Sequence, residues 1–113
     1  MLQRVDEVVQ ESERADQTVA ELCTACQLPR RTLNRVFQNA LGMGPATYLR
    51  RVRLNRARRA LQDERTRYTT VTDVALDLAF WHLGRFAEQY FELFGESPHE
   101  MLECVRSEVG TRA

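Results

Sequence analysis

The side chains of this sequence that could do chemistry are mainly arginines, and most of them fall in one block. Residues 28–67 contain eleven of the sixteen basic residues and two acids, a net charge of +9. Residues 1–27 and 68–113 carry net charges of −4 and −5, so the chain as a whole is formally neutral. Every basic residue is arginine, which suits bidentate contacts to phosphate and guanine, although an arginine-biased genome would explain the lack of lysine equally well. The clustering predicts one face that meets phosphates.

A second candidate site is Cys23-Thr-Ala-Cys26, a spacing also found in metal and redox sites. A structural zinc site needs four ligands, and no second pair follows at a usable spacing. We interpret Cys23 as a small core residue, and His82 and His99 as surface residues at helix starts. The sequence shows no Ser/His/Asp set, phosphate loop or carboxylate pair. We therefore expect no enzyme activity, no metal site and no cofactor.

The composition indicates a soluble globular domain, with 43% hydrophobic and 28% charged residues in a chain of 113. No segment approaches the run of about eighteen apolar residues that spans a membrane. The first fifteen residues are too charged for a signal peptide. Three cysteines without an export signal favour a reduced, cytoplasmic protein.

Two parts of the chain repeat each other. At an offset of 52, Val19, Leu22, Cys23 and Leu28 correspond to Val71, Val74, Ala75 and Phe80. At an offset of 53, Leu33, Phe37, Leu41 and Leu49 correspond to Phe86, Tyr90, Phe94 and Leu102. The motif Gly-x-x-Pro recurs at 42–45 and 95–98. This agreement indicates two copies of one supersecondary unit.

Each copy has the pattern of a short helix, a tight turn and a longer helix. Thr18 and Thr70 have the form of N-terminal caps, the first followed by a capping-box Glu21. Apolar residues four apart then mark one buried face of the longer helix, which ends at Gly42 or Gly95. This is the outline of a helix-turn-helix.

The remaining segments complete an all-α fold of seven helices without strands. A helix at about 2–14 precedes the repeat, and short helices at about 18–26 and 70–78 open its two copies. Pro45 and Pro98 each open a helix, the second within the capping-box sequence of residues 97–100.

We expect one unit over 1–113, composed of residues 1–44, a connector helix at 45–62 and residues 63–113. The connector would span roughly 27 Å, somewhat less than the roughly 34 Å helical repeat of DNA. Mild bending of a duplex would absorb the difference.

These motifs together resemble a known family. The spacing Leu41-Gly42-x-x-Pro45-x-x-Tyr48-Leu49-x-x-x-Arg53-Leu54-x-x-Ala57, followed by Phe94-Gly95-x-x-Pro98, resembles the DNA-binding domain of AraC/XylS-type bacterial regulators over residues 17–104. Residues 80–86, with 30–33, are similar to the subgroup that contains ethanolamine-utilisation regulators. The resemblance implies sequence-specific binding of double-stranded DNA for transcription regulation, with two recognition helices in successive major grooves.

Three positions depart from the family pattern. Gln27 and Ala79 stand in turns where the family usually has glycine, whose missing Cβ makes a left-handed backbone easy. Each turn must therefore accept strain or adjust. Pro29 stands where a serine usually opens the first recognition helix, so we expect its capping hydroxyl to be lost.

The resemblance places base-reading residues of the first recognition helix at Arg31, Asn34 and Arg35. The helical spacing agrees, because burial of the apolar positions turns these three side chains outward. Arginine reads guanine and asparagine reads adenine in the major groove. A merely solvated arginine face is the alternative. Residues expected to contact the DNA backbone or to support binding are Arg30, Gln38, Arg50, Arg51, Arg58, Arg59, His82 and Gln89. The four arginines of the connector among them either contact phosphates or pair with acids, and are not expected to read bases.

The second recognition helix offers fewer polar groups. Its expected outward residues are His82, Leu83, Gly84, Arg85, Glu88 and Gln89. Only Arg85 is a strong base reader, and Glu88 would repel phosphate. We expect the second unit to be the weaker reader.

A protein-interaction module is the rival function, in which acidic residues 73–108 dock a partner such as RNA polymerase. Non-specific DNA coating is a third. Salt-dependent DNA affinity would separate the interaction module from the two DNA binders. Family members commonly carry a separate sensing or dimerising domain upstream. We expect this chain to be a C-terminal fragment that is monomeric by itself.

Overall fold

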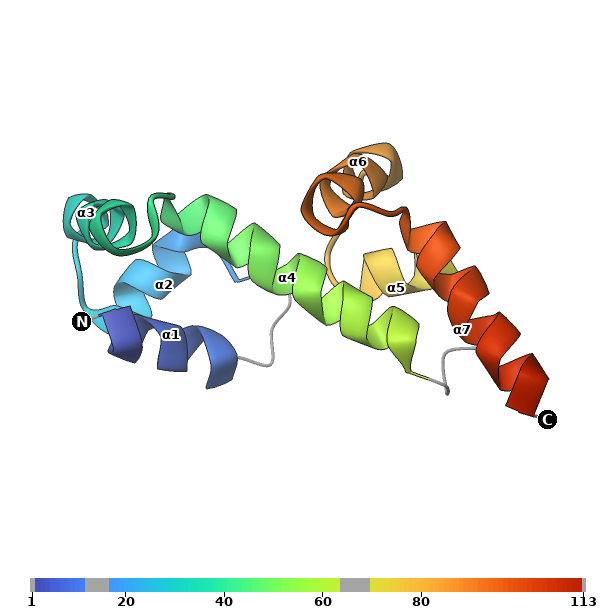
Figure 1. Ribbon diagram of the computed structural model, residues 1–113. Helices are drawn as coiled ribbons and strands as arrows, with labels where there is room; N and C mark the ends of the chain where they lie inside the picture. Colours follow the sequence, from blue (N-terminus) through green and yellow to red (C-terminus); the bar gives the residue numbers. More distant parts are fainter. Residues whose placement is uncertain (1, 12–16, 64–69, 113) are drawn as a thin grey trace. The chain divides into compact units, whose positions relative to one another are not determined.

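The computed structural model describes residues 2–11, 17–63 and 70–112 (Figure 1). The helices are α1 (Leu2–Glu11), α2 (Val19–Cys26), α3 (Arg30–Leu41), α4 (Pro45–Gln62), α5 (Val71–Asp77), α6 (Leu83–Phe94) and α7 (Pro98–Arg112). The described residues contain no strand, so the predicted all-α fold of seven helices is confirmed. Residues 12–14 of the helix expected at 2–14 lie outside the described residues.

The chain divides into two compact units, Met1–Val52 and Arg53–Ala113, and α4 contributes residues to both. The core of the first unit consists of Val5, Val9, Leu22, Cys26, Leu33, Phe37 and Leu49. The core of the second consists of Leu54, Ala57, Leu61, Val74, Ala75, Phe80, Phe86, Tyr90, Met101, Leu102 and Val105. Four residue pairs of the repeat are buried in the two cores, which is the physical reason that the pattern recurs: Leu22 with Val74, Leu33 with Phe86, Phe37 with Tyr90, and Leu49 with Leu102. Leu41, which the spacing placed on the buried face of α3, is instead 40% exposed at the end of that helix.

Side-chain caps define where the short helices begin. The hydroxyl of Thr18 accepts a hydrogen bond from the Glu21 amide at 3.1 Å, as predicted. Thr70 and Asp73 form a complete capping box, because Asp73 also accepts from the Thr70 amide at 3.3 Å. The sequence predicted only a cap at this second position. Ser97 caps α7 by accepting from the amide of Glu100 at 3.1 Å.

Both turns accept a left-handed residue without glycine. Gln27 has φ 57° and ψ 41°, and Ala79 has φ 63°. Of the two alternatives that the sequence left open, strain is therefore the one observed, at a cost of about 1–2 kcal/mol per residue. Pro29 provides no side-chain hydrogen bond to α3, as expected.

The two cysteines of α2 differ in burial. Cys26 is 5% exposed and packs in the first core, and this burial raises the pKa of its thiol. Cys23 is half-buried against the same core, so the fully buried position predicted for it belongs to Cys26. Leu22 and Cys26 lie four residues apart on one helix face, which turns Cys23 partly away from the core.

Candidate DNA-binding surface

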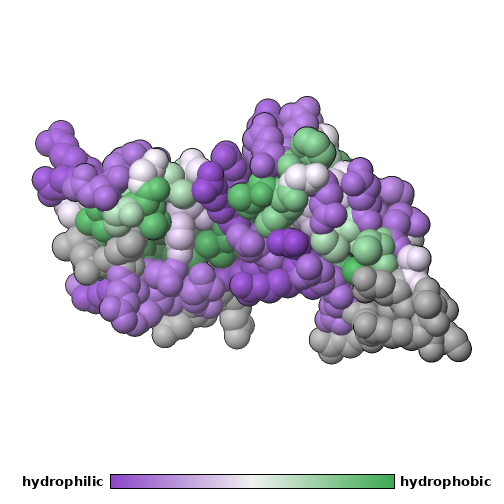
Figure 2. Space-filling model, viewed as in Figure 1, coloured by the Kyte–Doolittle hydropathy of each residue, from purple (hydrophilic) through white to green (hydrophobic). Residues whose placement is uncertain are grey.

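The helix α3 presents a polar face made of the side chains that the sequence predicted to point outward. Arg30, Arg31, Asn34, Arg35 and Gln38 are all exposed, whereas Leu33 and Phe37 are completely buried. Hydrophilic side chains cover the region of α3 at the upper left of Figure 2. Three guanidinium groups and two amides on one helix give many hydrogen-bond donors for phosphates and base edges.

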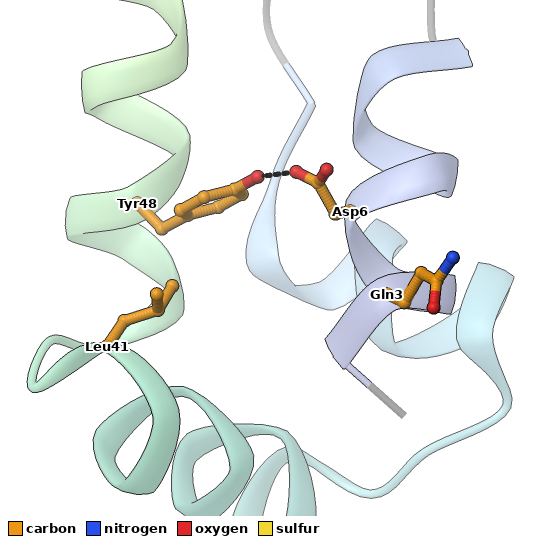
Figure 3. Close-up of a pocket in the computed structure, with 4 residues that line it drawn as sticks. All are labelled: Gln3, Asp6, Leu41 and Tyr48. Atoms are coloured by element: carbon orange, nitrogen blue, oxygen red, sulfur yellow. Dashed lines mark hydrogen bonds between the residues drawn. The ribbon is translucent and has the colours of Figure 1, made fainter.

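A contact network holds α3 within the first unit. The rings of Phe37 and Tyr48 lie 5.0 Å apart at their centroids and are tilted by 52°. The hydroxyl of Tyr48 on α4 points at Asp6 on α1 and donates a hydrogen bond to its carboxylate (Figure 3). Burial, together with this hydrogen bond and the negative charge of Asp6, raises the pKa of Tyr48 to about 12. Gln3 and Leu41 join these two residues around a hollow of about 380 Å³.

The helix α6 exposes a different set of side chains. Arg85 and Glu88 are exposed as predicted, whereas Gln89 is half-buried. Phe86 and Tyr90 fill the core, where their ring centroids lie 5.9 Å apart. The second helix therefore offers fewer polar groups than α3, in agreement with its composition.

The imidazole of His82 caps the N-terminus of α6. Its Nδ1 accepts a hydrogen bond from the amide of Arg85 at 3.1 Å, which requires the neutral tautomer with the proton on Nε2. The sequence placed His82 at the start of this helix as a supporting residue but did not identify it as the cap. Histidine is an uncommon cap residue, which is why no local signal indicated this role.

Three large apolar side chains are exposed on α6 or just before it. Trp81 is 75% exposed, Phe91 57% and Leu83 41%. Figure 2 shows green, apolar atoms among hydrophilic ones in the region of α6. Leu83 was predicted to point outward, whereas the sequence indicated no role for Trp81 or Phe91.

Comparisons with known proteins identify the family. Residues 22–103 match the family described as "Helix-turn-helix domain". The solved structure of a "probable AraC family transcriptional regulator" from Rhodopseudomonas palustris CGA009 is 35% identical, with a TM-score of 0.83 over 92% of this chain and 95% of that one. The chain belongs to the AraC family of helix-turn-helix transcription regulators.

Other similar proteins support the assignment of this domain to the AraC family. The XylDLEGF operon transcriptional activator of Pseudomonas putida is 33% identical over 107 residues, which cover 95% of this chain but 33% of that protein. A regulator with an AraC-type DNA-binding domain from Chromobacterium violaceum is 25% identical, with a TM-score of 0.80 over 90% of this chain and 88% of that one. The chain thus spans a third of the length of the activator. These relatives are transcription regulators, so the AraC-family domain is a DNA-binding domain and not an enzyme.

The arginines of α4 in this AraC-family domain differ in their surroundings. Arg51 and Arg59 are exposed, and Arg50 is half-buried. The guanidinium of Arg58 lies 4.9 Å from the ring centroid of Phe94, a cation–π contact that the sequence did not indicate. Arg51 and Arg59 are therefore more open to solvent than Arg58.

Arg53 has a positioning role that the sequence did not indicate. Its Nη1 donates a hydrogen bond of 3.1 Å to the carbonyl of Ala79, the left-handed residue of the second turn. Its guanidinium also lies 4.8 Å from the ring centroid of Phe80. The family spacing contained Arg53, but its partners are 26 and 27 residues away, so no local pattern could reveal them.

No helix in the described part of the chain is long and apolar enough to cross a membrane. Likewise, among the described residues no group of three or more His, Cys, Asp or Glu side chains could hold a metal ion.

Proposed function

We propose that this AraC-family domain binds a specific double-stranded DNA site with α3 and α6 in successive major grooves. The observation that carries the proposal is the exposed polar face of α3, because five donor-bearing side chains lie on one helix whose opposite face is buried. Two equivalent helix-turn-helix units support the use of two grooves. The eighteen residues of α4, at 1.5 Å each, extend for roughly 27 Å, somewhat less than the roughly 34 Å helical repeat of DNA, and mild bending of the duplex would absorb the difference.

Base reading is assigned to Arg31, Asn34 and Arg35 on α3 and to Arg85 on α6. All four are exposed. Arginine can pair with the O6 and N7 acceptors of guanine, and asparagine with N6 and N7 of adenine. Each good bidentate contact discriminates against a wrong base by about 1–3 kcal/mol.

Phosphate contacts are assigned to the supporting residues, with Arg30, Gln38, Arg51 and Arg59 the exposed members on α3 and α4. Such contacts fix the register of the protein on DNA without reading sequence. Log affinity should therefore fall linearly with log salt, with a slope of about −0.9 per phosphate neutralised.

The decisive experiment selects preferred sites from random DNA with the wild type and with Arg35→Ala. Loss of one base contact should relax preference at one or two positions in one half of the site. Arg4→Ala is the matched control, because Arg4 is an exposed arginine on α1. If Arg35→Ala and Arg4→Ala both recover the wild-type site, α3 does not read bases through Arg35.

Footprinting tests the two-groove arrangement. Two contacts centred about 10 base pairs apart, within roughly 20 protected base pairs, are expected on one face of the duplex. A single short contact would rule out simultaneous engagement of both helices.

A second candidate function is docking of RNA polymerase by the acidic second unit. Glu88 and Glu92 on α6 and Glu100 and Glu103 on α7 are exposed. The similar protein from Pseudomonas putida is named a transcriptional activator. Direct binding to purified polymerase, weakened by charge reversal at Glu100 and Glu103, would support this function. A DNA titration that is flat in salt would favour it over DNA binding.

We further propose that the domain acts in the bacterial cytoplasm and is monomeric by itself. Light scattering at micromolar concentration tests the monomer. The similarity of residues 80–86 to ethanolamine-utilisation regulators remains a prediction about the regulated genes. Transcript profiling with and without ethanolamine tests that prediction.

A further inference from the structure

The recognition helices α3 and α6 are the same element used twice. Each has twelve residues, and each ends at a left-handed glycine, Gly42 or Gly95. Their N-terminal cap residues, Pro29 and His82, lie the same 53 residues apart as those glycines. Every position on α3 therefore has a defined counterpart on α6.

This correspondence shows a change of chemistry on the outward face. The counterparts of Arg30, Arg31, Asn34 and Gln38 are Leu83, Gly84, Ala87 and Phe91, whereas the fifth outward residue, Arg35, corresponds to the charged Glu88. All four residues on α3 are polar and exposed, and none of the four on α6 is polar. We call the α6 set the apolar strip. Its members lie on one side of the helix, because Leu83, Ala87 and Phe91 follow each other at intervals of four.

The second core does not account for the two large residues of the apolar strip, Leu83 and Phe91, although Ala87 between them is half-buried. That core takes Phe86 and Tyr90 from α6, which are 1% and 0% exposed. Leu83 and Phe91 remain 41% and 57% exposed. Two large exposed apolar side chains, two turns apart on one side of α6, are typical of a surface that contacts another molecule.

Gly84 adds an independent observation. Its φ lies outside the left-handed region, and a Cβ there would meet only the imidazole of His82, at 3.5 Å, an ordinary contact. Alanine would therefore fit, and it would favour the helix. Glycine at this exposed position leaves room for another surface to approach the backbone of α6 closely.

We propose that the apolar strip reads thymines through their C5-methyl groups. The inference rests on the proposed DNA binding and specifies what the second helix recognises. Thymine is the base that presents a methyl group in the major groove, and apolar side chains recognise it by contact. Leu83 and Gly84 lie in the first turn of α6, and the N-terminal residues of a recognition helix are those that reach base edges. The first helix thus reads hydrogen-bonding groups, and the second reads methyl groups beside Arg85.

The experiment replaces thymines of the selected site by deoxyuridine, one at a time. Deoxyuridine lacks only the C5-methyl group, so the hydrogen-bonding edge is unchanged. Each methyl group that contacts the strip should strengthen binding about fourfold, the factor that corresponds to burial of one methyl group. The loss should be confined to the half of the site that α6 covers.

Variants then locate the contact on the protein. In Leu83→Ala, deoxyuridine should weaken binding less than twofold at the position that Leu83 contacts. Leu76→Ala is the matched control, because Leu76 is 42% exposed and lies on α5, outside the strip. This control should keep the full methyl dependence. Gly84→Ala should bind more weakly while its thermal midpoint is unchanged or higher, which separates close approach from folding.

Two results distinguish failure of this inference from failure of the proposed function. Specific binding with no deoxyuridine effect at any thymine would overturn the thymine reading and leave the strip as a protein-docking surface. Absence of specific binding by the wild type would refute the proposed function and the inference together. A methyl dependence that survives Leu83→Ala, Ala87→Gly and Phe91→Ala would assign methyl reading to residues outside the strip.

Discussion

The left-handed backbone at Gln27 predicts that loss of its side chain raises the free energy of unfolding. Gln27→Gly should stabilise the protein although it removes a side chain. Gln27 is exposed and has φ 57° and ψ 41°, a conformation in which the Cβ of an L-residue costs about 1–2 kcal/mol. Glycine removes this cost but loses about 0.5–1 kcal/mol more conformational entropy on folding. The net expected gain is about 0.5–1 kcal/mol.

Two further glycine variants serve as comparisons for Gln27→Gly. Ala25→Gly affects an exposed, right-handed residue of the same helix, so it should destabilise by about 0.5–1 kcal/mol. Ala79 is also left-handed, at φ 63°, but its side chain is only 9% exposed. Ala79→Gly therefore loses a buried methyl group, at about 0.8 kcal/mol, and should be close to neutral.

Urea unfolding measures the three effects. With a slope of about 2 kcal/mol per molar urea, a gain of about 1 kcal/mol raises the midpoint by about 0.5 M. DNA affinity of Gln27→Gly should stay within about twofold of the wild type, because the turn keeps its geometry. A midpoint lowered by Gln27→Gly as much as by Ala25→Gly would refute the assignment of strain to this turn.

Three further predictions concern single contacts. Arg53→Met should lower the unfolding free energy by about 1.5–3 kcal/mol, because the carbonyl of Ala79 loses a charged donor, and urea unfolding should show the loss. The raised pKa of Tyr48, about 12 against 10.0, means that its stabilising contribution is complete below pH 10 and is lost as the pH rises toward 12. The free energy of unfolding, measured from pH 9 to 12, should fall by up to about 2–3 kcal/mol because of Tyr48. In Tyr48→Phe this fall should be smaller, and the remaining pH dependence should come from Tyr90, whose pKa is also about 12. Glu88→Gln should tighten binding to all DNA sequences alike by removing repulsion from phosphates, and an affinity loss in gel-shift titrations would contradict that reading.

The helices, their order and the outward face of α3 were predictable from the sequence alone. The spacing of Leu33 and Phe37 defines a buried face, and the opposite residues must then be exposed. Gly42 and Gly95 end their helices because both adopt a left-handed backbone conformation, which glycine reaches easily and which stops a right-handed helix. These signals lie within a few residues of the feature that they determine, so the local sequence is enough to predict these features.

Tertiary structure decided the contacts between distant residues. Arg53 reaches Ala79, and Tyr48 reaches Asp6, across 26 and 42 positions of the chain. The partial burial of Gln89 likewise depends on which side of α6 meets its neighbours. The sequence also left open whether the two turns without glycine adjust or accept strain. The packing within each unit answers this. The helices before and after the turn contribute to the same core, which sets where the chain leaves one helix and enters the next, and the backbone of the turn has to follow.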